Sequence, residues 1–331
     1  MPHSVKKALK LLFRYSSILF FALAIYIVWG QVKKLGIASI VESIFSIPVS
    51  SIVWAAIVVV IGYLALSLYD FLALKYINKT MAPSRVLAAS MSGFAVSNNV
   101  GHAYISGAAV RYDFYSSWGL TGGDILKMIG FSTLTYVLGV GFLLDISLLV
   151  TPATEIPGEV LKPEVLYGGG AVMTLAFLVY WFAVIVPKRT LHIKKVVLPA
   201  PSKTMTLTQI ALGAIDMLLV AVVCYIVMQH SIKLNFIHFL SIFMIAQFIG
   251  LSTQVPGGIG VFEGLFLYLL PPEMEDSGGV MASLIVFRIM YYFIPLALAG
   301  LSILAYQSRP IREMIFGADN PAKDENGEEV L

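Results

Sequence analysis

Charged residues are scarce in this sequence. Asp, Glu, Lys and Arg make up 12% of the 331 residues, whereas 58% are hydrophobic. A soluble domain carries roughly 25% charged residues, and it needs them to cover its surface in water. The composition therefore excludes a soluble enzyme and indicates a protein whose surroundings are mostly lipid.

Cysteine is almost absent as well. Cys224 is the only one, which excludes an intrachain disulfide and a metal site built from cysteines. His192, His230 and His238 have no ligand-like spacing, so we expect no metal and no cofactor. The net charge is only +3, and its Lys and Arg residues lie in short loops, which is not the pattern of a nucleic-acid-binding protein.

Long apolar runs dominate what is present. A bilayer core about 30 Å thick needs about 20 apolar residues in a helix. Six runs meet this requirement: Leu11–Val32, Ser50–Leu74, Ile125–Val150, Val165–Val186, Thr206–Met228 and Val280–Tyr306. Two further stretches, 85–111 and 237–270, are apolar but are interrupted by polar residues or by proline and glycine.

The interrupted stretches are expected to turn back inside the membrane, where a broken helix is tolerated only against protein or a cavity. If both turn back, 17 basic residues face one side and four face the other. If both cross, the basic loop Lys188–Lys203 moves to the outside. The positive-inside rule therefore favours two re-entrant hairpins, with both termini in the cytoplasm.

This topology divides the chain into two similar halves. Residues 11–150 read span, span, hairpin, span, and residues 165–306 repeat that order. Because each half crosses three times, the second half is inverted, as in many transporters. The predicted fold class is an all-α integral membrane protein with six transmembrane helices and two re-entrant hairpins. Residues 1–10 and an acidic, disordered tail at 317–331 are expected in the cytoplasm.

Charged side chains at membrane depth are the strongest functional candidates, because burying them there is costly. Asp216 and Arg288 lie in the middle of their spans, Glu263 lies in the returning limb of the second hairpin, and Arg111 closes the first hairpin. Asp70 and Asp145 lie nearer span ends, where water could satisfy them. The arginines could bind an anionic headgroup through their planar guanidinium groups. Equally, these charges could pair to hold the halves together, or Asp70, Asp216 and Glu263 could couple ions.

The segment Pro256-Gly257-Gly258-Ile259-Gly260 interrupts the second hairpin. It is expected to end one half-helix and begin another, which would expose backbone amides for an anion. The alternative is that Gly257, Gly258 and Gly260 only permit close helix packing.

The first hairpin carries Asn98, Asn99 and His102 in an apolar setting. These side chains could contact a polar headgroup, or they could satisfy backbone groups freed by the turn. His102 with Asp113 could also act as a general base. Tyr291 and Tyr292 are interpreted as interfacial or packing residues.

Three motifs resemble one known family. Val255-Pro-Gly-Gly-Ile-Gly-Val-Phe-Glu263, Ser67-Leu-Tyr-Asp-Phe-Leu-Ala-Leu-Lys75 and Gly107-Ala-Ala-Val-Arg111-Tyr112 are similar to the lysylphosphatidylglycerol synthase transmembrane region. The resemblance covers about 11–306 and implies a lipid translocase of a bacterial inner membrane. Its motif positions here would be Asp70, Arg111, Pro256, Gly257, Gly258, Gly260 and Glu263. The two-part members carry an aminoacyl-transferase domain that this sequence lacks, so we expect that it does not itself aminoacylate a lipid.

The leading hypothesis is a flippase that moves an anionic or aminoacylated phospholipid between leaflets. Two other classes stay open: an intramembrane lipid-modifying enzyme, and an accessory or scaffold subunit of a lipid or glycan synthase. The expected partner is a membrane phospholipid, and a homodimer and a lipid-synthesising enzyme partner are both left open.

Overall fold

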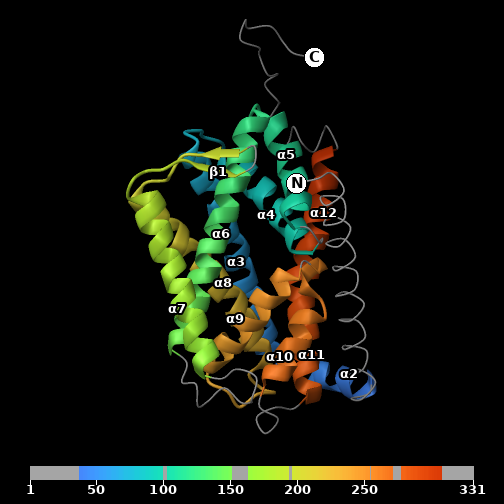
Figure 1. Ribbon diagram of the computed structural model, residues 1–331. Coiled ribbons are helices and arrows are strands. Elements are labelled where there is room, and N and C mark those ends of the chain that lie inside the picture. The colour runs from blue at the N-terminus through green and yellow to red at the C-terminus, as the bar shows by residue number, and fades with distance from the viewer. Residues whose placement is uncertain are drawn as a thin grey trace, which may run out of the picture.

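The computed structural model describes residues 37–99, 103–150, 163–193, 196–253, 255–270 and 277–307. The predicted span Leu11–Val32, residues 1–10, the tail 317–331 and His102 lie outside them. Within these ranges the chain is almost entirely helical, as Figure 1 shows.

Five helical segments of 19 to 29 residues are long and apolar enough to cross a bilayer. At 1.5 Å per residue they measure about 28 to 44 Å. They lie within α3 (Val49–Tyr76), α6 (Gly122–Val150), α7 (Pro163–Tyr180) with the π-turn η1 (Trp181–Ile185), α8 (Lys203–Met228), and the run of α11 (Ser277–Arg288), η4 (Ile289–Phe293) and α12 (Ile294–Gln307). Each coincides within a few residues with one of the predicted spans.

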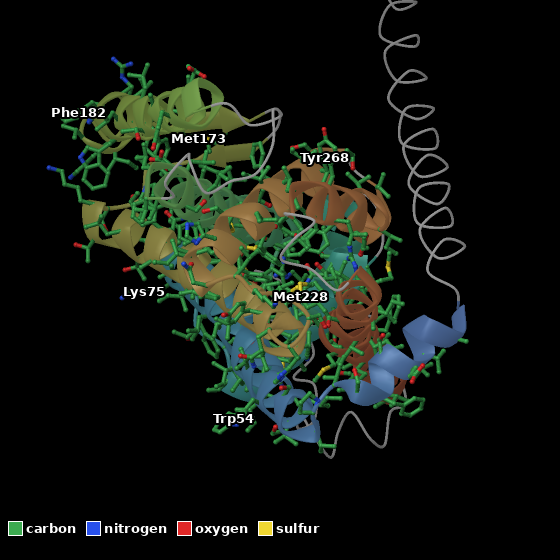
Figure 2. All side chains as sticks on the ribbon, turned by 90° about the horizontal axis from the view of Figure 1, so that it is seen from below. Trp54, Lys75, Met173, Phe182, Met228 and Tyr268 are labelled. Carbon is green, nitrogen blue, oxygen red and sulfur yellow. The ribbon has the colours of Figure 1, made fainter. Side chains whose placement is uncertain are left out.

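The outer surface of the bundle is apolar. Seen from below in Figure 2, Trp54 and Phe182 lie at the rim, and their exposed fractions are 61% and 66%. Met228, near the middle of the same view, is fully buried. Large apolar patches of this extent are rare on soluble monomers, so the structure agrees with the composition on a multi-pass α-helical membrane protein.

The two interrupted stretches form pairs of shorter helices. The first pair is α4 (Pro83–Asn99) and α5 (Ala103–Ser117), and the second is α9 (Phe236–Ser252) and α10 (Val261–Leu269), joined through the 3₁₀ turn η2 (Pro256–Gly258). In Figure 1 the pair α4–α5 lies toward one end of the bundle beside α12. The pair α9–α10 reaches toward the opposite end, where α10 contacts α11.

The two halves of the chain meet most closely where α6 crosses α8. A Cβ atom added to Gly139 of α6 would lie 2.1 Å from the carbonyl carbon of Gly213 in α8. Glycine permits this approach because it has no side chain. Small residues commonly serve in this way between membrane helices. Helix α8 packs against α3 as well as α6, so α8 lies at the centre of the bundle.

Two small elements complete the fold. Helix α2 (Ile37–Ser46) packs against α11. Strands β1 (Leu191–Ile193) and β2 (Val196–Leu198) form an antiparallel hairpin in the basic loop before α8. The hairpin corrects the all-α prediction locally, because strands of three residues leave almost no alternating pattern to read.

Candidate functional site

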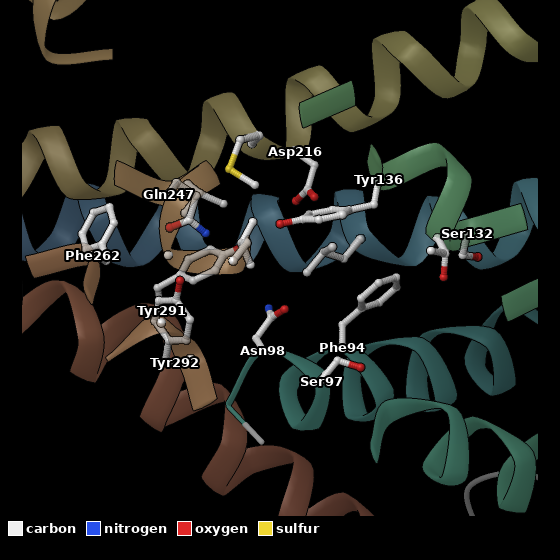
Figure 3. A pocket seen from close by; sticks show the side chains of 18 of the residues that line it. Phe94, Ser97, Asn98, Ser132, Tyr136, Asp216, Gln247, Phe262, Tyr291 and Tyr292 are labelled. Atoms are coloured by element: carbon white, nitrogen blue, oxygen red, sulfur yellow. The ribbon is translucent and has the colours of Figure 1, made fainter. Parts of the chain in front are cut away.

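A cavity of about 370 Å³ lies between the two helix pairs. Both pairs line it, α4 and α5 on one side and α9, η2 and α10 on the other, and α3, α6, α8 and η4 complete the wall. Figure 3 shows side chains from these elements pointing toward its centre, among them Asn98, Tyr136 and Asp216. Both interrupted stretches of the sequence therefore contribute residues to one internal cavity.

Arg111 enters the cavity from α5. Its Nε lies 3.2 Å from Oδ2 of Asp70 on α3, and its guanidinium carbon lies 3.8 Å from the centre of the Phe94 ring. Its Nη2 is buried and none of the described residues accepts a hydrogen bond from it. Arg111 therefore keeps donor capacity at the cavity wall.

Asp70 is a buried partner for Arg111 and is not a water-exposed group near a span end. Its exposed fraction is 1%, and it accepts hydrogen bonds from Tyr115 at 2.9 Å and Ser132 at 3.4 Å. The expectation that water satisfies Asp70 is wrong, because α5 and α6 cover this part of α3.

Gly93 on α4 makes room for the Arg111 side chain. A Cβ atom at Gly93 would lie 2.8 Å from Cγ of Arg111, which is closer than real Cβ contacts allow. The absence of a side chain at this position thus sets the path of Arg111 into the cavity.

Glu263 and Arg288 form a second buried ion pair, at the other side of the cavity. Nε of Arg288 donates to Oε1 of Glu263 at 2.6 Å, and Nη1 donates to the Gly257 carbonyl oxygen at 2.5 Å. The guanidinium carbon lies 4.6 Å from the centre of the Tyr292 ring. Arg288 does not line the cavity, so the structural alternative, an ion pair, describes it better than headgroup binding.

The break at Pro256–Gly260 is present, but its amides are largely engaged. Gly257, Gly258 and Gly260 have φ values of +59°, +62° and +81°, a region that glycine occupies without strain. The Gly260 N–H donates to Oε2 of Glu263 at 2.6 Å, and the Gly258 N–H donates to the Val255 carbonyl at 2.9 Å. These two amides are therefore engaged within the chain, where Glu263 caps α10.

Neighbouring asparagines in the first helix pair have different surroundings. Nδ2 of Asn99 donates to the carbonyl oxygens of Ala95 and Tyr292 at 2.8 and 3.0 Å. Asn99 thus satisfies backbone groups, one of them in the π-turn η4. Asn98 lines the cavity. His102 lies outside the described residues, so the headgroup and general-base interpretations of it remain predictions.

Asp216 on α8 also lines the cavity, with an exposed fraction of 2%. The Tyr69 hydroxyl donates to its Oδ2 at 3.0 Å. Asp145, the other carboxylate of uncertain role, lies on α6 outside the cavity and accepts from Thr174 at 2.8 Å. Among the described residues, no group of three or more His, Cys, Asp and Glu side chains could hold a metal ion.

Sequence reasoning missed the aromatic part of the site. Tyr291 and Tyr292 line the cavity together with Tyr136. From the sequence, Tyr291 and Tyr292 are interpreted as interfacial or packing residues. The π-turn that presents Tyr291 and Tyr292 follows Arg288 directly, and such turns gather at functional sites.

Comparison with known proteins identifies the family of this chain. The sequence profile of the lysylphosphatidylglycerol synthase TM region matches residues 16–299. An uncharacterized protein of Synechocystis sp., slr0712, is 29% identical over 288 residues, covering 87% of this chain and 89% of its own. The inner membrane protein YbhN of Escherichia coli is 28% identical over 254 residues, covering 76% of this chain and 78% of its own.

A longer relative is matched over only part of its length. The phosphatidylglycerol lysyltransferase of Bacillus subtilis is 25% identical over 248 residues, which are 72% of this chain and 28% of that protein. The profile covers most of the chain, including both helix pairs and both ion pairs. The chain therefore belongs to the lysylphosphatidylglycerol synthase TM region family.

Proposed function

We propose that this protein is a lipid flippase, which moves a phospholipid between the two leaflets of a membrane with the headgroup in the cavity between the helix pairs. The observation that carries the proposal is Arg111. A buried guanidinium with a nitrogen free to donate, at the wall of a cavity inside a membrane protein, is suited to a phosphate oxygen. The acyl chains would stay in the surrounding bilayer.

Family membership supports a lipid as the transported molecule. Relatives of this chain are named phosphatidylglycerol lysyltransferase, an activity on a phospholipid, and the match covers 28% and 27% of two of them. We propose that this chain transports its lipid without changing it chemically. The enzymatic alternative uses His102 and nearby carboxylates, and His102 lies outside the described residues.

The proposed topology has both helix pairs turning back inside the membrane. Helices α4 and α9 have 17 residues each, α5 has 15 and α10 has 9, all shorter than the roughly 20 needed to span. The positive-inside rule then places both termini in the cytoplasm and makes the halves an inverted repeat. YbhN, by name an inner membrane protein, supports a bacterial inner membrane as the location.

The ion pairs suggest how such a protein changes its access. Arg111 joins α5 of the first pair to α3 through Asp70, and Glu263 of α10 in the second pair joins α11 through Arg288. A buried ion pair thus connects the first helix pair to α3, and another connects the second helix pair to α11. Alternate loosening of these contacts would open the cavity first to one leaflet and then to the other.

The test is translocation in liposomes that contain the purified protein and a headgroup-labelled phospholipid. A membrane-impermeant quencher reports how fast label reaches the outer leaflet. Wild type should accelerate exchange between leaflets over protein-free liposomes, and Arg111→Gln should lower that rate to near the protein-free level. The matched control Lys127→Gln removes an exposed cation from α6, away from the cavity, and should leave the rate unchanged.

A second variant separates loss of function from loss of folding. Arg111→Gln alone leaves Asp70 buried without a cation, which destabilises proteins. The double variant Asp70→Asn with Arg111→Gln removes both charges, so it should fold yet remain inactive. A wild-type rate in that folded double variant contradicts the proposed role of Arg111.

A further inference from the structure

Asp216 is a buried carboxylate with an unused oxygen at the wall of the cavity. Its exposed fraction is 2%. Oδ2 accepts from the Tyr69 hydroxyl at 3.0 Å, but none of the described residues donates to Oδ1. Buried polar atoms in native proteins nearly always have a partner, so an exception that faces a cavity indicates a missing ligand.

The two arginines near the cavity are each paired with a carboxylate, whereas Asp216 is not paired with a basic residue in the part of the chain that the structure describes. Arg111 is paired with Asp70, and Arg288 is paired with Glu263. Among the described residues, no Lys, Arg or His forms an ion pair with Asp216. Asp216 therefore has no counter-charge among the described residues, and a cation is the group that would complement its carboxylate.

The surroundings of Asp216 favour an organic cation. Besides Tyr69, whose hydroxyl donates to Asp216, two further tyrosines, Tyr136 and Tyr291, line the same cavity as this carboxylate. The rings of Tyr63 and Tyr291 have their centres 5.6 Å apart, and in Figure 3 Tyr136 points into the cavity beneath Asp216. Aromatic faces beside a carboxylate attract ammonium groups through the negative face of each ring.

Within the proposed flippase function, we propose that Asp216 and its surrounding tyrosines bind the ammonium group of a zwitterionic phospholipid headgroup. Arg111 and Asp216 both line the same cavity, so one headgroup can place its phosphate at Nη2 of Arg111 and its ammonium at Oδ1 of Asp216. An anionic headgroup without an amine leaves Asp216 buried and unpaired, and is disfavoured. Of the two headgroup classes expected from the sequence, anionic and aminoacylated, the proposal favours one that carries an amine as well as a phosphate.

Binding, measured without transport, tests this proposal. Purified protein in detergent is mixed with equal amounts of phosphatidylethanolamine and phosphatidylglycerol with identical acyl chains, and bound lipid is counted by native mass spectrometry. A hydrogen bond to a charged group predicts a preference of about tenfold for phosphatidylethanolamine. In Asp216→Asn the preference should fall to near unity.

Two controls keep the result interpretable. Asp145→Asn removes another buried carboxylate, outside the cavity, and should keep the wild-type preference. Phosphatidylethanolamine with an N-acetylated amine has no ammonium, so wild-type protein should lose its preference for it, whether or not Asp216→Asn folds.

The outcomes separate this proposal from the flippase proposal. Equal binding of both lipids by wild type, or an unchanged preference in Asp216→Asn, overturns the ammonium site even if translocation is observed. Stabilisation by Na⁺ that depends on Asp216, with no lipid preference, assigns the site to an inorganic cation and also overturns it. A lipid preference without translocation supports the ammonium site and contradicts the flippase.

Discussion

Nε of Arg288 lies 2.6 Å from Oε1 of Glu263, and the other oxygen of the same carboxylate accepts the Gly260 N–H. One side chain therefore caps α10 and neutralises a buried arginine of α11. The family motif that ends at Glu263 thus has a structural explanation in this chain: it closes the break in the second helix pair.

We predict that Glu263→Gln destabilises the protein by about 3–5 kcal/mol, since it leaves Arg288 buried without a counter-charge. The measurement is the apparent melting temperature in detergent. Glu263→Gln with Arg288→Met should recover part of the loss, because no buried charge then lacks a partner. A double variant less stable than Glu263→Gln contradicts this explanation.

Gly93→Ala should impair translocation more than it impairs folding. Its new Cβ would collide with Cγ of Arg111 at 2.8 Å, and Arg111 can move only by withdrawing from its place at the cavity wall. Gly300→Ala is the matched control, because a Cβ there meets nothing within 4 Å. Equal translocation rates in the two variants would show that the position of Arg111 does not matter.

Alanine substitutions at Asn98 and Asn99 should affect different properties: the first should mainly lower translocation, and the second should mainly lower stability. Asn99→Ala removes the hydrogen bonds to the Ala95 and Tyr292 carbonyls and should lower stability by about 1–3 kcal/mol, because two partly buried acceptors lose a donor. Asn98→Ala, at the cavity wall, should lower translocation more than it lowers the melting temperature. Melting curves and liposome assays of both variants check the prediction, and the reverse order would refute it.

Gly139→Ala should disrupt the contact between α6 and α8. A Cβ at 2.1 Å from backbone of the facing helix cannot be accommodated without moving it, and overpacking of this kind destabilises by about 1–3 kcal/mol or more. Gly168→Ala on α7, where a Cβ meets nothing within 4 Å, should behave like wild type. Size-exclusion profiles of the two variants after mild heating check this prediction. Identical profiles would mean that α6 and α8 can move apart at little cost in stability.

The long helices could be predicted from the sequence because a bilayer sets the length of apolar sequence that each crossing needs. About 20 consecutive apolar residues are needed to cross it, and hydropathy reads that length directly. The predicted span Ser50–Leu74 accordingly differs from α3 by one or two residues at each end. The interruptions at 85–111 and 237–270 were visible for the same reason, since polar residues, proline and glycine break an apolar run.

The partners of the buried charges could not be read from the sequence. Whether Arg111 meets Asp70 or a headgroup depends on how α5 packs against α3, which is a long-range property. The tyrosines around Asp216 were missed for another reason: tyrosine is common at membrane interfaces, so hydropathy cannot tell an interfacial ring from one that lines an internal cavity.

The central claim is that a phospholipid headgroup occupies the cavity between the two helix pairs. The most direct test is a high-resolution cryo-electron microscopy map of the protein in lipid nanodiscs. We predict density for a headgroup in the cavity, with a phosphate within hydrogen-bond distance of Arg111 and acyl chains running into the bilayer. A well-resolved cavity that contains only water contradicts the account.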